Sequence, residues 1–80
     1  MIEAVVRTLE SWTRHIAVLG AFTPQEHKDE YILITEFVCH SEGDSFSKAL
    51  RTCRDYSLKE GMEPTILKEL INATLNQLIK

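Results

Sequence analysis

The sequence predicts an all-α fold, a small four-helix bundle or array formed by a single helical domain over residues 1–80. Apolar residues recur at helical spacing in four segments, and each segment begins or ends at residue types that favour helix termini. A chain of 80 residues has room for one hydrophobic core. Four helices with short connections then pack as a compact bundle or array.

The first predicted helix covers residues 2–19. Its apolar residues alternate between spacings of three and four, which is the pattern of a single helix face. They are Ile2, Val5, Leu9, Trp12, Ile16 and Leu19. Gly20 follows directly and suits a helix end, because glycine adopts positive φ without strain. This face packs either inside the bundle or against another chain.

The second predicted helix covers residues 24–40. Thr23 is suited to cap it, Pro24 to occupy its first position and Glu26 to close a capping box. The apolar run at residues 31–38 is rich in β-branched side chains and is also compatible with a short buried strand. We favour a helix, because the cap is good and the sequence offers no partner strand.

The third and fourth predicted helices cover residues 45–60 and 64–79. Gly43 suits the end of the preceding helix, Asp44 can cap the third, and Pro64 suits the first position of the fourth. Apolar residues occupy more than half of the circumference of the fourth helix, where Ile66, Leu75 and Ile79 widen its face. The four helices therefore offer more apolar surface than one small core can cover, which indicates an interface.

Charge and composition exclude several classes of protein. The net charge is −3 and the basic residues are scattered, which argues against nucleic-acid binding. No apolar stretch approaches the roughly 20 residues that span a bilayer, so we expect no membrane insertion. The N-terminal sequence does not resemble a secretory signal, which favours an intracellular, cytoplasmic location. We expect Cys39 and Cys53 to be reduced, buried thiols.

The sequence contains no catalytic or metal-binding signature. The histidines and cysteines lack the spacing of a structural zinc site, and adjacent Cys39 and His40 point about 100° apart on a helix. The loose group of carboxylates at residues 26–36 is typical of a solvated helix face. We therefore expect neither an enzyme nor a bound cofactor or metal.

The segment Asp44-Ser45-Phe46, preceded by Glu42-Gly43, resembles the serine region of acyl and peptidyl carrier proteins. In that family Asp-Ser and a large apolar residue open a helix, and the serine hydroxyl carries a phosphopantetheine arm. The resemblance implies that Ser45 is the attachment site. An Asp-Ser pair is also typical of an ordinary helix N-cap, so both interpretations stay open.

The functional prediction is a small non-catalytic helical protein that acts through protein–protein interaction, as an adaptor, regulatory or chaperone-like subunit. Its contact would be with a protein partner or a second copy in a homodimer, through the apolar face of the helix at residues 2–19. The alternative is a carrier protein with a phosphopantetheine arm on Ser45.

Overall fold

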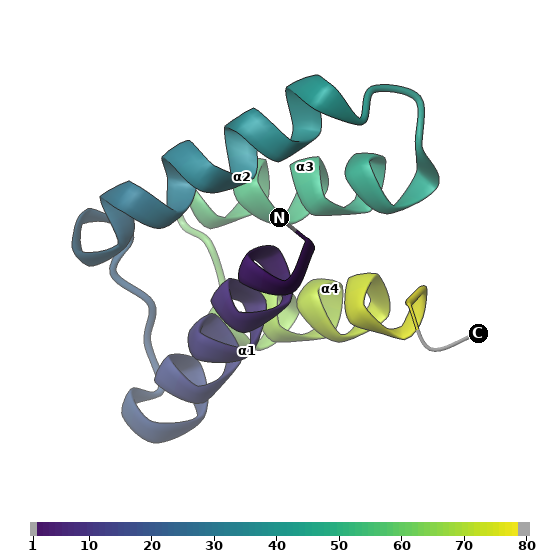
Figure 1. Ribbon diagram of the computed structural model, residues 1–80. Coiled ribbons are helices and arrows are strands. Elements are labelled where there is room, and N and C mark those ends of the chain that lie inside the picture. The colour runs from purple at the N-terminus through teal and green to yellow at the C-terminus, as the bar shows by residue number, and fades with distance from the viewer. Residues whose placement is uncertain (1, 79–80) are drawn as a thin grey trace.

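The computed structural model describes residues 2–78, and every regular element within them is helical (Figure 1). The α-helices are α1 (Ile2–Leu19), α2 (Lys28–His40), α3 (Ser45–Ser57) and α4 (Pro64–Asn76), and a short 3₁₀ helix, η1 (Pro24–His27), precedes α2. The prediction of an all-α fold is confirmed. Residues 31–38 lie within α2, so the helical alternative for this run is the correct one.

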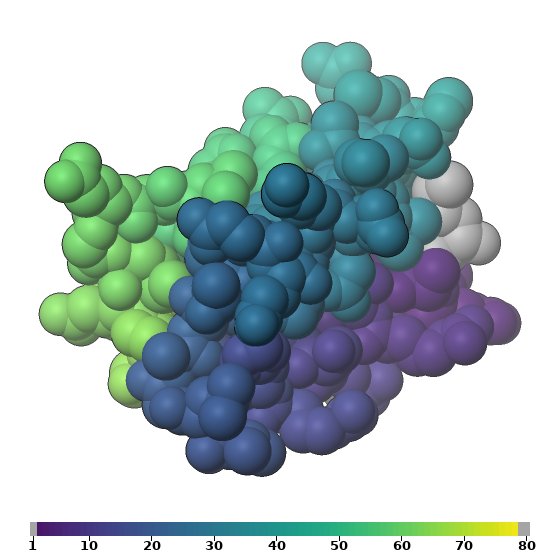
Figure 2. Space-filling model, turned by 90° about the vertical axis from the view of Figure 1, so that its left-hand side faces the viewer, coloured from purple at the N-terminus to yellow at the C-terminus, as the bar shows by residue number. Residues whose placement is uncertain are grey.

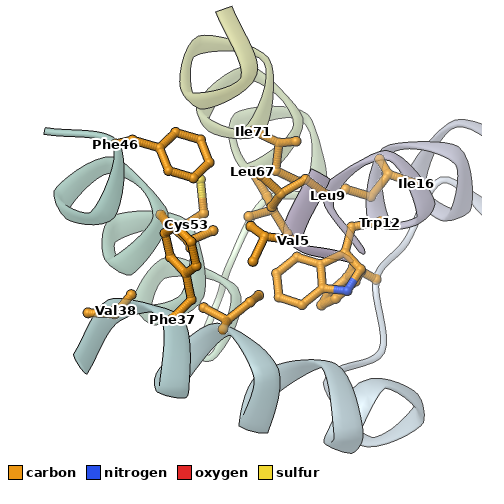
Figure 3. Close-up of a cluster of buried hydrophobic side chains, with 13 residues drawn as sticks. Val5, Leu9, Trp12, Ile16, Phe37, Val38, Phe46, Cys53, Leu67 and Ile71 are labelled. Carbon is orange, nitrogen blue, oxygen red and sulfur yellow. The ribbon is translucent and has the colours of Figure 1, made fainter. Parts of the chain in front are cut away.

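The four helices enclose one hydrophobic core. Each helix packs against the next along the chain, and α4 also packs against α1. Figure 1 shows α2 and α3 side by side, with α1 and α4 on the other side of the core. The core side chains, most of which are labelled in Figure 3, are Val5, Leu9, Trp12, Ile16, Phe22, Ile34, Phe37, Val38, Phe46, Leu50, Cys53, Leu67 and Ile71.

The start of α3 follows its sequence signals. Gly43 has a φ of +95°, a conformation that is costly for a side-chain-bearing residue. The side chain of Asp44 then accepts a hydrogen bond from the backbone N–H of Phe46 at 3.4 Å. Asp44 is therefore the N-cap, as predicted, and it aims the first turn of α3 so that Phe46 enters the core.

Three predicted helix ends differ from the structure, and one predicted helix residue lies outside the described residues. The side chain of Thr23 makes no capping hydrogen bond, and Pro24–His27 forms a 3₁₀ turn that buries His27 instead of a first α-helical turn. Helix α3 ends at Ser57, because the backbone N–H groups of the next two residues bond back to Asp55 and Tyr56 in a tightened turn. Helix α4 ends at Asn76, and predicted position Ile79 lies outside the described residues.

The apolar face of α1 is divided between core and surface. Val5, Leu9 and Trp12 are fully buried and Ile16 is 5% exposed, whereas Ile2 and Leu19 are 42% and 64% exposed. Figure 3 shows these four side chains in the core cluster, with Val5 and Leu9 beside Leu67 of α4. They pack inside the chain's own core and are inaccessible to a second chain, so any contact through α1 must use its ends or its outward face.

Candidate functional site

A polar cluster connects α1 to the start of α2. The carboxylate of Glu30 accepts a hydrogen bond from Trp12 Nε1 at 3.2 Å and another from His27 Nδ1. The other ring nitrogen of His27 is 3.2 Å from His15 Nδ1. Phe22 stacks on the His27 ring, with centroids 4.7 Å apart. The 3₁₀ turn of η1 makes this possible, because it directs His27 inward.

The two histidines of this cluster bond to each other and to one carboxylate. The Glu30 carboxylate accepts from Nδ1 of His27, and His27 Nε2 and His15 Nδ1 share a second hydrogen bond. His15 Nε2 is buried and has no hydrogen-bond partner in the described residues. Glu26 Oε2 lies 3.8 Å away from it. The cluster joins α1, η1 and α2.

No group of three His, Cys, Asp or Glu side chains in residues 2–78 is arranged to hold a metal ion. The cysteines are both free thiols. Cys53 is buried as predicted, and burial raises the pKa of its thiol, partly offset by a hydrogen bond with Thr74. The prediction for Cys39 was wrong: it is exposed, because it lies on the side of α2 opposite the core residues Ile34 and Phe37.

An apolar groove lies between α2 and α3. It is a hollow of about 660 Å³, and its walls are Pro24, Gln25, Lys28, Tyr31, Ile32, Thr35, Arg54, Asp55 and Leu58. Ile32 and Leu58 expose 59% and 58% of their surface there. Figure 2 shows this side of the molecule, where the start of α2 (blue) lies beside the end of α3 (green). We call this feature the α2–α3 groove.

Polar contacts hold the two walls of the α2–α3 groove together. Arg54 on α3 donates to the Thr35 hydroxyl on α2 at 3.1 Å, and within α3 it also donates to Asp55 at 3.1 Å. Ser57 donates its proton to the carbonyl of Arg54 at 2.6 Å, so Tyr31 is the donor in the hydrogen bond between Tyr31 and Ser57. The groove is therefore pre-formed.

The environment of Tyr31 keeps its hydroxyl protonated. Burial raises the pKa of Tyr31 above its ordinary value of 10.0, the hydrogen bond with Ser57 lowers it in part, and the charge of Glu30 raises it further. A neutral hydroxyl is the form that can donate to Ser57. Tyr31 also packs on the Trp12 ring at a centroid distance of 5.0 Å, which links the groove wall to the core.

Ser45 is exposed at the first position of α3. A second hollow lies beside it, lined by Ile2, Asp44, Ser45, Phe46, Gln77 and Leu78. Of the residues in the predicted contact face of α1, Ile2 alone reaches this hollow. Leu19 is exposed at the opposite end of α1, where it lines a shallow surface hollow with Val18. The structure therefore does not bring the accessible members of that face together.

Sequence reasoning missed Ile32 and Leu58 as surface residues. A signal for Ile32 was present, because consecutive residues on a helix point about 100° apart and the run Tyr31-Ile32-Leu33-Ile34 cannot all face one core. Ile34 is fully buried, and Ile32 therefore faces outward. Leu58 directly follows the last residue of α3, and its position depends on where that helix ends.

Comparison with known proteins returns no match, since no family model, curated protein or solved structure is significantly similar to this chain. Within residues 2–78, none of the helices combines the length and the apolar character needed to cross a bilayer.

Proposed function

We propose that this chain is a small non-catalytic protein that acts by binding another protein chain, as an adaptor, regulatory or chaperone-like subunit, and that the α2–α3 groove is its contact surface. The observation that carries the proposal is the pair of large apolar side chains, Ile32 and Leu58, exposed together in one pre-formed groove. A scattered exposed residue needs no explanation, but two that share a groove favour a contact site.

Simple energetics support a contact of modest strength. Each of the two side chains is more than half exposed. Covering both would contribute roughly 2 kcal/mol, taking about 1.5–3 kcal/mol for the complete burial of one such side chain. The hydrogen bonds of Arg54 and Tyr31 already fix the groove walls, so little ordering is needed on binding. A cytoplasmic location belongs to the same proposal, because both cysteines are free thiols.

Site-specific photo-crosslinking in the native cells tests this function. A photoreactive amino acid replaces Ile32 or Leu58 in the full chain, and exposed Glu69 on α4 is replaced as the matched control. We expect covalent adducts with a protein chain from positions 32 and 58 and little adduct from position 69. Equal yields at all three positions, or none at positions 32 and 58, would contradict a contact in the groove.

A carrier protein is the second candidate, and the exposure of Ser45 beside a hollow favours it. A hydroxyl at the start of a helix is open to a modifying enzyme, and the hollow between α1, α3 and α4 offers space next to it. Bound phosphopantetheine would supply a thiol to which acyl groups attach. Mass spectrometry of the natively produced protein tests this candidate. A mass increase of one phosphopantetheine group that is lost in Ser45→Ala supports it, and an unmodified chain contradicts it.

A further inference from the structure

The outward side of α2 carries an apolar residue between two opposite charges. Lys28, Ile32 and Glu36 are four positions apart and exposed, on the side of the helix that faces away from the core residues Ile34, Phe37 and Val38. Neither Lys28 nor Glu36 forms an ion pair within the described residues. We call Lys28, Ile32 and Glu36 the α2 strip.

The α2 strip is complementary to itself under two-fold symmetry. When two copies of a helix pack antiparallel about one central residue, a residue four positions before the centre lies opposite the residue four positions after it. With Ile32 at the centre, Lys28 of each copy lies opposite Glu36 of the other. The rise of 1.5 Å per residue places both about 6 Å from the centre, so the long side chains can meet on both sides of the isoleucines.

The next residues along the helix agree with this arrangement. Asp29 and Thr35 are each three positions from Ile32 and exposed, so the same symmetry sets a carboxylate opposite a hydroxyl donor. A parallel arrangement would instead place Lys28 opposite Lys28 and Glu36 opposite Glu36, which is repulsive. The charges therefore select the antiparallel pairing.

We propose that the occupant of this surface is a second copy of the same chain, in an isologous dimer whose α2 helices pack antiparallel about Ile32. The inference rests on the proposed function, since Ile32 belongs to both the α2 strip and the α2–α3 groove. Leu58, which directly follows α3, lines the same groove as Ile32 and extends the apolar centre of the contact beyond α2. The ion pairs at the rim set the orientation, and the apolar centre supplies the attraction.

A charge exchange in the purified full chain tests the pairing. Lys28→Glu and Glu36→Lys each place like charges opposite one another twice, and the double variant restores opposite charges. Both substitutions leave α2 stable, because an acidic residue in the first turn and a basic residue toward the end suit the helix dipole. Lys48→Glu on the exposed side of α3 is the matched control for the change of net charge in Lys28→Glu.

Sedimentation equilibrium measures the dimer dissociation constant at low salt. We expect each single variant to weaken the dimer about tenfold, since two rim ion pairs are replaced by two repulsions. The double variant and Lys48→Glu should remain within about threefold of the wild type, a difference below the energy of one surface ion pair. Ile32→Asp should abolish the dimer.

Two results would overturn the dimer. One is a wild type that stays monomeric at millimolar concentration, and the other is a double variant no stronger than the single variants. If crosslinking from position 32 reaches a foreign chain while the pure protein is monomeric, the dimer is refuted and the proposed function stands. If position 32 reaches no protein chain, the proposed function fails as well.

Discussion

The apolar face of α1 and the α2–α3 groove differ in how their apolar residues are spaced. The face of α1 has unbroken three-and-four spacing, and its central residues Val5, Leu9 and Trp12 are fully buried. The α2–α3 groove is apolar because Ile32 and Leu58 line it. These two residues belong to no such pattern, and each is more than half exposed. The centre of the regular apolar face is thus buried by neighbouring helices of the same chain, whereas the two apolar residues outside the pattern lie at the surface, where we propose that a partner binds.

Replacing an apolar residue by aspartate in each of the two regions should give the largest difference in stability. Leu9→Asp places an unpaired carboxylate in a fully buried site, at a cost of several kcal/mol, and we expect the chain to unfold. Ile32→Asp introduces the same group at an exposed site and should change the free energy of unfolding by no more than about 0.5 kcal/mol. Far-UV circular dichroism with urea unfolding compares them. A folded Leu9→Asp monomer would mean that the α1 face contacts another chain.

The reactivity of the two cysteines tests the same difference between exposed and buried sites, and it requires no substitution in the core. Cys39 is exposed on α2, whereas Cys53 is buried and burial raises the pKa of its thiol. Because the thiolate is the reactive form, we expect Cys53 in the native protein to react with iodoacetamide at least about a hundredfold more slowly than Cys39. Peptide mapping after timed labelling measures both rates, and urea should make them similar. Equal rates in the native protein would contradict the packing of α3.

The polar cluster connects α1 to the start of α2, and removing one of its side chains should have an intermediate effect on stability. His27→Gln removes a buried ring that bonds to Glu30 and packs on Phe22, and we expect a loss of about 1–3 kcal/mol in the free energy of unfolding. His40→Gln is the matched control, because His40 is exposed at the end of α2 and should change stability by less than about 0.5 kcal/mol. Equal losses in urea unfolding would show that the cluster does not connect α1 to α2.

The ionisation of Tyr31 in the groove wall should have the smallest effect on stability, and this effect appears only at alkaline pH. Its pKa is raised in the folded protein, chiefly by burial, so the unfolded chain loses this proton first as pH rises. The stabilisation is complete below about pH 10, the ordinary pKa of tyrosine, and is lost as pH rises through the folded pKa. The stability advantage of wild type over Tyr31→Phe should therefore stay constant up to about pH 9 and shrink only as pH rises above about 10. A constant difference in urea unfolding would contradict a buried, hydrogen-bonded hydroxyl.

Local sequence signals predicted most of the fold and little of the candidate site. The helices follow from periodicity, and the start of α3 follows from Gly43 and Asp44. The polar cluster could not be predicted, because His15, His27 and Glu30 meet only after α1 and α2 pack. The first turn before α2 was also missed, because Pro24–His27 gives up α-helical geometry while burying His27 in that cluster.

The prediction of a contact face on α1 shows why spacing alone is insufficient. Leu9 and Trp12 satisfy the pattern of a helix seam equally well whether α4 and α2 or a second chain covers them. Only the packed chain distinguishes these cases. The exposure of Ile32 was open to prediction from the run of apolar residues around it. Leu58 lies 26 positions away in sequence and lines the same groove only because α2 packs against α3.

The most direct test of the central claim compares crosslinking from the two regions in one experiment. A photoreactive residue is placed at position 32 in the groove or at position 19, where Leu19 is the most exposed member of the α1 face. Adduct mass then identifies either a second copy or a different chain. We predict a strong protein adduct from position 32 and little from position 19. A strong adduct from position 19 with none from position 32 would contradict the account.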